Sequence, residues 1–390
     1  MPRLCAKKDC TGCYACSSIC PKGAITMQED ECGYIYPAID EKKCIECKMC
    51  EKTCPYTNRV EQKYPLRCYA ARVKDKDMLK KASSGGIATL ISEKIIEKNG
   101  VVYGAAFGKD CCVEHIRIEN KEELEKLRGS KYVHSYIKDS YVNAKKDLEN
   151  MKIVLFIGTP CQIAGLKKYL KKEYENLYTV DLICHGVPSQ KFLKDEVKRL
   201  NNNLIEIDRV NFRDKDVGDF KFAIKKKEDI VYSKYWYNEP YYYTFMRSIT
   251  YRENCYNCLY ARPERVSDLT IGDFWGLEED SKFYATRNDG ISVILPITLK
   301  GKSIIAMISE NVEMEERNIE EAIQGNAQLR EHVKKNKYVD KFKEAYKDNN
   351  NFYLTYRKIC AKHIYKEKLK SNALIKMLLK VRKGVGYAKK

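Results

Sequence analysis

Two runs of four cysteines near the N-terminus constrain this chain more than any other feature. The first begins at Cys10 and the second at Cys44, and each has the spacing C-x2-C-x2-C-x3-C followed by proline. This is the spacing of two-cluster iron–sulfur proteins, in which the fourth cysteine of a run ligates the cluster held by the other run. A zinc site or a disulfide scaffold is the alternative, but neither requires four-cysteine runs that end in proline and occur twice.

The sequence therefore predicts two 4Fe–4S clusters with interleaved ligands, in a small ferredoxin domain over residues 1–60. Three thiolates from one short loop converge on a cluster, and amides of the same turns hydrogen-bond its sulfides and tune its potential. The ligands predicted for the first cluster are Cys10, Cys13, Cys16 and Cys54. Those predicted for the second cluster are Cys44, Cys47, Cys50 and Cys20.

The remaining cysteines raise the alternative of a secreted, disulfide-bonded protein. The first residues, Met-Pro-Arg-Leu-Cys, contain no apolar signal region. No stretch approaches the ~18 continuous apolar residues of a membrane span. Iron–sulfur ligation also requires thiolates, which persist in a reducing compartment, so we expect a cytoplasmic location. The cysteines without a predicted role are Cys5, Cys32, Cys68, Cys111, Cys112 and Cys360.

The net charge of +18 invites a nucleic-acid interpretation, but its distribution argues against one. Residues 362–390 contain ten Lys and Arg against one acidic residue, so half of the excess lies in one short tail. No basic stripe with interleaved aromatic residues marks a nucleic-acid channel. We therefore expect no nucleic-acid partner.

Residues 351–390 are predicted to form a basic helical tail. Apolar residues recur on one face of this helix, with lysines and arginines around them. Such a helix either packs on the protein with solvated lysines or makes peripheral contact with an anionic membrane surface. The residues of the apolar face are Leu369, Ala373, Leu374, Met377, Leu378 and Val381.

Residues 65–350 are predicted to form a larger α/β domain with a mixed sheet and C-terminal helices, in two parts divided near residue 150. Near-continuous apolar runs are typical of strands buried on both faces, and turns followed by helices indicate βαβ units with parallel strands. Strands are expected at 67–72, 101–107, 152–158, 179–184, 266–275 and 291–308, with an antiparallel hairpin in 209–233. Helices are expected at 87–98, 120–127, 140–149, from 161 through 170, within 235–251 and within 319–348.

A turn of two serines and two glycines precedes the first helix of this domain. Ser83 or Ser84 is expected to cap the helix, because serine hydroxyls accept hydrogen bonds from the first amides of a helix. Together with Gly85 and Gly86, this turn exposes amides that suit a phosphate or pyrophosphate. A plain helix cap is the alternative interpretation.

Four further cysteines form a third constellation. Cys161 and Cys184 follow two predicted parallel strands, at the sheet edge where open α/β folds bind ligands. Cys255 and Cys258 form a CxxC just before another strand. We expect these four residues to converge on a third 4Fe–4S cluster. Buried free cysteines, a zinc half-site or a redox pair are the alternatives.

Several short motifs, in this order, make the chain resemble the family of beta subunits of coenzyme F-420 (deazaflavin) hydrogenases and dehydrogenases, in its bacterial branch. With the ferredoxin domain included, the resemblance covers roughly residues 5–300. The motifs are SSGG at 83–86, GSKYV at 129–133, GTPCQ at 158–162, CHGVPS at 184–189, CYNC at 255–258 and IGDFW at 271–275.

The resemblance implies a flavoprotein with FAD beside a cluster. It places flavin-phosphate contacts at the turn of residues 83–86 and at the turn of Thr159 and Pro160, with Lys131 as a partner of the flavin ring or phosphate. In archaeal members the flavin exchanges a hydride with a deazaflavin. For bacterial members the acceptor is unsettled, and some are associated with surface-polysaccharide synthesis.

Our hypothesis is an iron–sulfur flavoprotein oxidoreductase. Its partners would be a ferredoxin-like or other one-electron redox protein and a deazaflavin or other hydride acceptor. The flavin is the necessary converter, because 4Fe–4S clusters carry single electrons whereas a deazaflavin takes a hydride. His185 is a candidate proton donor, and a histidine hydrogen-bonded in a turn is the alternative. The other histidines are not accompanied in the sequence by a second ligand or a nucleophile. The rival functions are a non-catalytic electron-transfer subunit and an accessory redox protein of surface-polysaccharide synthesis.

Overall fold

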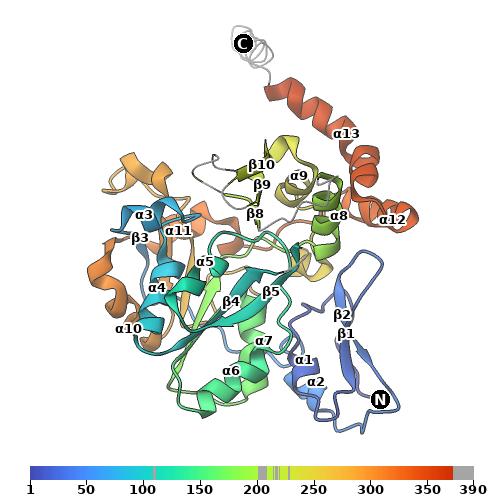
Figure 1. Ribbon diagram of the computed structural model, residues 1–390, viewed down its shortest axis with the longest axis horizontal. Coiled ribbons are helices and arrows are strands. Elements are labelled where there is room, and N and C mark those ends of the chain that lie inside the picture. The colour runs from blue at the N-terminus through green and yellow to red at the C-terminus, as the bar shows by residue number, and fades with distance from the viewer. Residues whose placement is uncertain are drawn as a thin grey trace, which may run out of the picture.

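The computed structural model describes residues 1–108, 111–200, 209–213, 215, 218, 220–226 and 229–371, with side chains described as far as residue 361. Within them, a small two-stranded sheet, a three-stranded sheet and an eight-stranded sheet are joined by helices (Figure 1). The mixed α/β fold class is as predicted. No helix of the described residues is long and apolar enough to cross a membrane.

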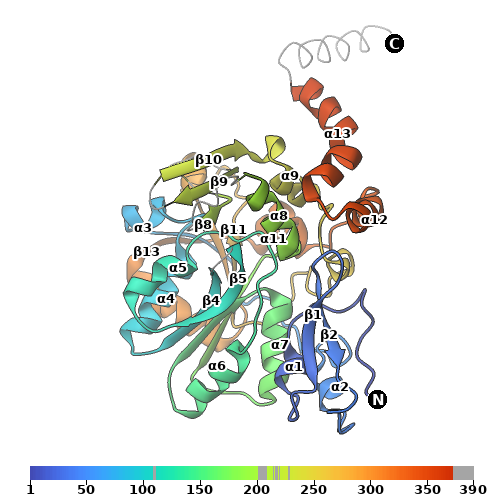
Figure 2. The ribbon, with the colours of Figure 1, turned by 45° about the vertical axis from the view of Figure 1, so that its right-hand side comes forward.

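Residues 1–60, here called the ferredoxin module, lie beside the larger domain. Strands β1 (Ile25–Glu29) and β2 (Ile35–Ile39) pair antiparallel, and the short helices α1 (Ala15–Ser18) and α2 (Met49–Thr53) each contain one cysteine of a run. Figure 2 shows α1 against helix α7 (Pro160–Leu170) of the larger domain. Cys13 and Ala15 of the module and Ile163 of α7 belong to one buried hydrophobic cluster.

The large sheet has the strand order β13-β3-β12-β11-β7-β6-β4-β5. The four central strands, β11, β7, β6 and β4, are mutually parallel, and the outer pairings are antiparallel. The strands are β3 (Tyr69–Val73), β4 (Val101–Phe107), β5 (Val113–Ile118), β6 (Val154–Gly158), β7 (Leu177–Leu182), β11 (Leu269–Asp273), β12 (Ser292–Pro296) and β13 (Val312–Glu316). Strands from both sides of residue 150 thus share one sheet.

Helices cover both faces of this sheet. Successive strand residues point to opposite faces, so Val102 and Leu155 pack with helices α4 (Ile87–Glu97) and α10 (Leu299–Ile308). Their neighbours, Tyr103 and Phe156, pack on the other face with α6 (Ser140–Glu149) and α7. Burial on both faces explains why the central strands are near-continuous apolar runs.

An aromatic cluster forms the remaining part of the larger domain. Tyr241, Tyr242, Phe192 and Phe342 are fully buried in it. The strands of its antiparallel sheet are β8 (Arg209–Asn211), β9 (Lys221–Lys226) and β10 (Asp229–Tyr235). The neighbouring helices are α8 (Gln190–Leu200), α9 (Pro240–Met246), α12 (Val339–Asn349) and α13 (Phe352–Ser371). Helices α3 (Lys76–Lys80), α5 (Leu124–Leu127) and α11 (Ile319–Gly325) are short and belong to the body around the large sheet.

Two local predictions are wrong. The strand expected to reach residue 308 ends at Pro296, and α10 follows because the Thr298 hydroxyl accepts a hydrogen bond from the amide of Gly301. Neither Ser83 nor Ser84 caps α4. The cap residue is Gly86, at φ 81°, and the serine hydroxyls instead bond neighbouring loops.

The tail is described only in part. Helix α13 begins at Phe352, and the buried side chains of Tyr356 and Cys360 pack it against the aromatic cluster. Figure 1 shows its far end extending away from the domain. The predicted apolar face, from Leu369 to Val381, lies outside the described side chains.

Candidate functional site

The two cysteine runs form two separate cavities in the ferredoxin module. The structure groups the fourth cysteine of each run with the first three of the other run, as the predicted ligand sets require. The first cysteine group is Cys10, Cys13, Cys16 and Cys54, with Cys5 as a fifth thiol in the same cavity. The second cysteine group is Cys20, Cys44, Cys47 and Cys50.

Tight loops hold these cysteines. Gly12 and Tyr14 have positive φ values of 65° and 66°, and Lys48 has 58°, so each run turns sharply between its cysteines. The amide of Gly12 donates to Sγ of Cys10 at 3.4 Å, and the amide of Ala24 donates to Sγ of Cys20 at 3.2 Å. These are the amide–sulfur contacts that tune iron–sulfur sites.

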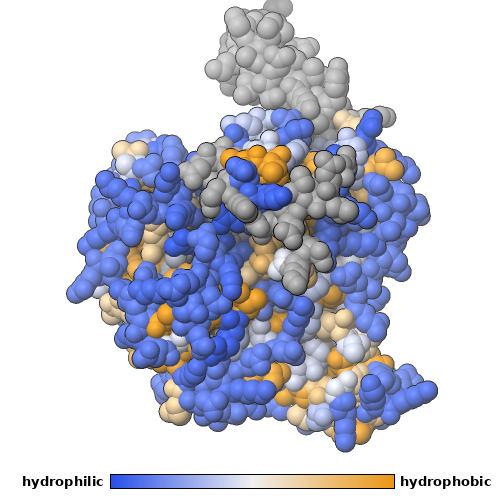
Figure 3. Space-filling model, in the orientation of Figure 1, coloured by the Kyte–Doolittle hydropathy of each residue, from blue (hydrophilic) through white to orange (hydrophobic). Residues whose placement is uncertain are grey.

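The two groups differ in exposure. Cys10 and Cys13 are 7% and 8% exposed, whereas Cys47 is exposed. Figure 3 shows hydrophobic residues over the module at the lower right of an otherwise mostly hydrophilic face. A hydrogen bond from Cys5 and the nearby charge of Arg252 lower the pKa of Cys10 to about 6, which favours the thiolate that ligation needs. The first group therefore lies against the larger domain, whereas the second group reaches solvent at Cys47 although its Cys50 is buried.

The third cysteine group lines one cavity, as the sequence predicts. Cys161 lies in the first turn of α7 after β6, Cys184 lies two residues beyond β7, and Cys255 and Cys258 come from the 3-10 turn Glu253–Asn257 and the residue after it. Burial raises the pKa of Cys161 and of Cys255 to about 12. Among the described residues that line the cavity none is Asp or Glu, and its four thiols suit soft iron–sulfur ligation. His134, His185 and His332 also line it.

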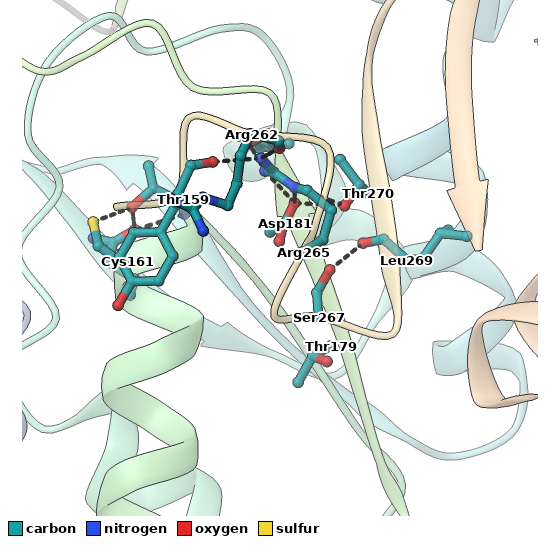
Figure 4. A network of polar contacts seen from close by, with 12 residues as sticks. Thr159, Cys161, Thr179, Asp181, Arg262, Arg265, Ser267, Leu269 and Thr270 are labelled. Atoms are coloured by element: carbon teal, nitrogen blue, oxygen red, sulfur yellow. Dashed lines mark hydrogen bonds and ion pairs between the residues drawn. The ribbon is translucent and has the colours of Figure 1, made fainter. Parts of the chain in front are cut away.

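A buried polar network fixes the loop that carries Cys258 (Figure 4). Arg265 and Asp181 form an ion pair at 2.7 Å with both side chains at most 1% exposed. The same guanidinium donates to the carbonyl of Tyr260 at 2.8 Å and of Leu182 at 3.1 Å. One side chain thus joins the segment after Cys258 to the end of β7, just before Cys184.

Among the described residues, no group of three or more His, Cys, Asp or Glu side chains is arranged to hold a single metal ion. A cube of four irons and four sulfides separates its cysteine ligands more widely than one ion does. The cysteine cavities therefore suit clusters rather than a mononuclear site, because each of them contains at least the four thiols that one cluster needs.

A larger pocket of about 320 Å³ opens at the carboxyl ends of the central strands, and it is here called the large pocket. Its volume lies in the range of small-molecule and cofactor sites. Of the predicted flavin contacts, it is lined by Ser83, Ser84, Gly86, Lys131 and Thr159. Gly85 and Pro160 lie outside this lining. A Cβ on Gly85 would be 2.5 Å from the carbonyl oxygen of Ala71, and Pro160 lines the third cysteine cavity.

Polar contacts shape the pocket wall. The Ser83 hydroxyl accepts from the amide of Ser130 at 3.1 Å, and the Ser84 hydroxyl donates to the carbonyl of Ile291 at 3.2 Å. Lys131 Nζ donates to the carbonyls of Leu127, Arg128 and Gly129 at 2.8, 2.7 and 3.2 Å. Burial lowers the pKa of Lys131 to about 7. Lys131 therefore closes the turn of residues 127–131 as well as lining the pocket.

Comparison with protein families decides the class of protein. Residues 68–139 match the N-terminal part, and residues 151–322 the C-terminal part, of the coenzyme F-420 hydrogenase/dehydrogenase beta subunit. Residues 9–58 match a 4Fe-4S dicluster domain. The chain belongs to the family of coenzyme F-420 hydrogenase/dehydrogenase beta subunits. The ferredoxin match also supports iron–sulfur clusters in the module.

Two relatives of this family member come from methanogens. It is 26% identical over 334 residues to the coenzyme F-420-dependent sulfite reductase of Methanocaldococcus jannaschii, with 79% of this chain and 47% of that protein covered. It is 23% identical over 241 residues to one of the subunits of the F-420H2 dehydrogenase of Methanosarcina mazei, with 57% and 66% covered. The chain thus spans about half to two thirds of these relatives.

One solved structure also aligns with this family member. It is that of the F-420-reducing [NiFe] hydrogenase complex from Methanosarcina barkeri, with a TM-score of 0.48 and 19% identity. The alignment covers 74% of this chain and 96% of the other.

Two buried residues escaped the sequence analysis of this family member. His134 is 5% exposed, lines both the large pocket and the third cysteine cavity, and has no hydrogen-bond partner for Nε2 among the described residues. Arg252 lies beside it and is 1% exposed. His134 directly follows the motif of residues 129–133, and this adjacency was the one available signal. His185, the predicted proton donor, also lines both cavities.

The Arg265–Asp181 pair generates a stability prediction. Replacing Arg265 by Met leaves the buried Asp181 carboxylate without its counter-charge, so we expect the free energy of unfolding to fall by about 3–5 kcal/mol. The matched control is Arg67→Met, which removes an exposed pair with Glu316 and should change stability by less than about 1 kcal/mol. Anaerobic urea titrations measure both, and equal losses in the two variants would contradict this role of Arg265.

Proposed function

We propose that this protein is a cytoplasmic iron–sulfur flavoprotein oxidoreductase. It moves electrons between three 4Fe–4S clusters and FAD, and exchanges a hydride with a deazaflavin (coenzyme F-420) or another soluble acceptor. Membership of the family of beta subunits supports the redox class. The observation that carries the proposal is that the large pocket and the third cysteine cavity share a wall.

The shared wall consists of residues that line both cavities. They are His134, Thr159, Cys184, His185, Gly186 and Val187. Cys184 is itself a member of the third cysteine group, and Thr159 also contacts Sγ of Cys161 at 3.2 Å through its hydroxyl. A group bound in the large pocket would therefore be separated from the third cysteine group by single side chains.

The third cysteine group adjoins the large pocket through this wall, and it also adjoins the first cysteine group. Thr11, which follows Cys10, lines the third cysteine cavity. A Cβ on Gly165 of α7 would lie 3.1 Å from Sγ of Cys13, and α7 begins with Pro160 and Cys161. The three cysteine groups and the large pocket thus follow one another from the exposed second group inward.

Each set of residues has a role in this proposal. The twelve grouped cysteines hold three clusters, and FAD binds in the large pocket against Ser83, Ser84, Gly86, Lys131 and Thr159. Gly85 and Pro160, which lie outside the pocket lining, shape the two turns that carry these contacts. Bound clusters supply one-electron transfer and bound flavin supplies two-electron hydride chemistry. His185, between the large pocket and the third cysteine cavity, is placed to hold or donate a proton at its imidazole nitrogens. Burial lowers the pKa of His185, which favours the neutral imidazole.

The second cysteine group is the proposed contact for a one-electron redox partner. Cys47 is exposed, and the neighbouring Ile45 is 56% exposed. A carrier protein can approach this group without any rearrangement, whereas the first and third groups are enclosed by both parts of the chain.

The content of iron, acid-labile sulfide and flavin in anaerobically purified protein tests the proposal. We expect about twelve iron atoms and one FAD per chain, because each of three clusters contains four irons. A content of about eight irons with one FAD would exclude the third cluster but would still support a flavoenzyme. About eight irons without flavin, even after incubation with FAD, would overturn the proposal and favour a non-catalytic electron-transfer subunit.

A cysteine variant tests the third group. Cys258→Ser should lower the iron content by about four atoms per chain, because serine is a poor ligand for this cluster. Cys112→Ser is the matched control, since Cys112 lies in none of the cysteine cavities, and it should leave the iron content unchanged. Unchanged iron in Cys258→Ser would refute ligation by this residue.

A lysine variant tests the large pocket. Lys131→Met leaves three carbonyls of the pocket wall without their donor, so we expect FAD affinity to fall about tenfold while the iron content stays constant. Lys126→Met is the control, because Lys126 lies on the exposed side of α5 and, among the described residues, pairs with Glu123 alone. FAD titration followed by flavin fluorescence measures both variants. Equal affinity in both would exclude Lys131 from the flavin site.

A further inference from the structure

Arg252 joins the larger domain to the ferredoxin module. It stands directly before the 3-10 turn that carries Cys255, and its side chain enters the module. Nε donates to the carbonyl of Cys10 and Nη2 to the carbonyl of Ile35, both at 2.7 Å. The guanidinium stacks over the ring of Tyr36 at 4.3 Å. With 1% of its surface exposed, it is among the most completely buried large side chains of the described part of the chain.

The charge of this side chain has no carboxylate partner. Within the described residues, Arg252 forms no ion pair with Asp or Glu, and its Nη1 has no hydrogen-bond acceptor. Two carbonyl groups and one aromatic ring hold the guanidinium in place. A buried guanidinium without a counter-ion is strongly unfavourable, so this arrangement requires a negative group nearby.

The position of Nη1 of Arg252 indicates where this negative group lies. Nη1 would be 3.1 Å from a Cβ placed on Gly12, so the cation lies against the loop between Cys10 and Cys13. On its other side, the backbone of Arg252 accepts from the amide of Cys255 at 3.0 Å and donates to Val187 at 2.9 Å. The same residue therefore contacts the segments that carry the first and third cysteine groups.

We propose that Arg252 is a positioning residue that serves as the buried counter-charge of the cluster held by the first cysteine group. A cluster ligated by four thiolates carries net negative charge, which is the group that the guanidinium lacks. This inference rests on the match to the 4Fe-4S dicluster domain and does not require the flavin.

The charge has a consequence for electron flow. A one-electron carrier that reduced a cluster in this site would add one unit of negative charge to it, and the buried cation would stabilise that reduced state. Arg252 therefore raises the reduction potential of the first cluster. The second cluster, near solvent and outside the contacts of Arg252, receives no such stabilisation. This stabilisation by Arg252 favours electron transfer from the second cluster to the first.

The test compares two variants by EPR-monitored redox titration of the anaerobic holoprotein. Arg252→Gln keeps a donor for the carbonyls but removes the charge, whereas Arg252→Lys keeps both the charge and a donor. In Arg252→Gln, we expect the equilibrium constant for reduction of the first cluster to fall about tenfold, which is a shift of about 59 mV for a one-electron couple. The second cluster should keep its potential and serve as the internal control. Arg252→Lys should restore most of the shift.

Equal potentials in Arg252→Gln and the unmodified protein would overturn the proposal, as would an equal shift in both clusters. If Arg252→Gln loses the iron of the first group, Arg252→Lys decides whether the charge or the shape of the Arg252 side chain is required. Full iron content and an unshifted potential in Arg252→Lys would support the role of charge. Loss of iron in Arg252→Lys as well would show that the guanidinium shape, and not its charge, holds the loop. FAD content measured on the same samples separates these outcomes from a failure of the flavoprotein proposal.

Discussion

The close approach of the first cysteine loop to the larger domain determines how the parts of this protein work together. A Cβ on Gly165 of α7 would lie 3.0 Å from the Cβ of Cys13, and a Cβ on Gly12 would lie 2.8 Å from Cε1 of His134. Packed interiors do not accommodate such overlaps, so these two glycines allow the module to dock. Arg252 then ties the docked loop to the turn that carries Cys255. Without this contact the first and third cysteine groups would not be neighbours.

This docking places the first cysteine group between the second group and the third. The second group includes the exposed Cys47, the first is enclosed between module and domain, and the third lies at the sheet edge behind it. The parallel strands β6 and β7 end side by side, and each is followed within three residues by a member of the third group. The same strand ends form one wall of the large pocket. The proposed electron path rests on this arrangement.

The sequence predicted the local features of this arrangement better than the long-range ones. The apolar run of β4 and the strand–turn–helix units around Cys161 were visible because their signals are contiguous, and parallel strands place their carboxyl ends at one edge. Residues 299–308 have the apolar content of a strand but form a helix, which the cap at Thr298 starts. His134 and Arg252 could not be found, since their significance lies in burial and in contacts across more than 100 residues of sequence. The ferredoxin spacing, by contrast, is a local pattern with one main structural solution.

Anaerobic rapid mixing of the oxidised holoprotein with a reduced one-electron carrier protein tests the central claim most directly, because it follows clusters and flavin in the same molecule. If the cysteine groups and the large pocket form one path, the iron–sulfur absorbance will bleach first and the flavin absorbance will follow at a rate independent of carrier concentration. Flavin reduction that precedes cluster reduction, or that never follows it, would contradict the account.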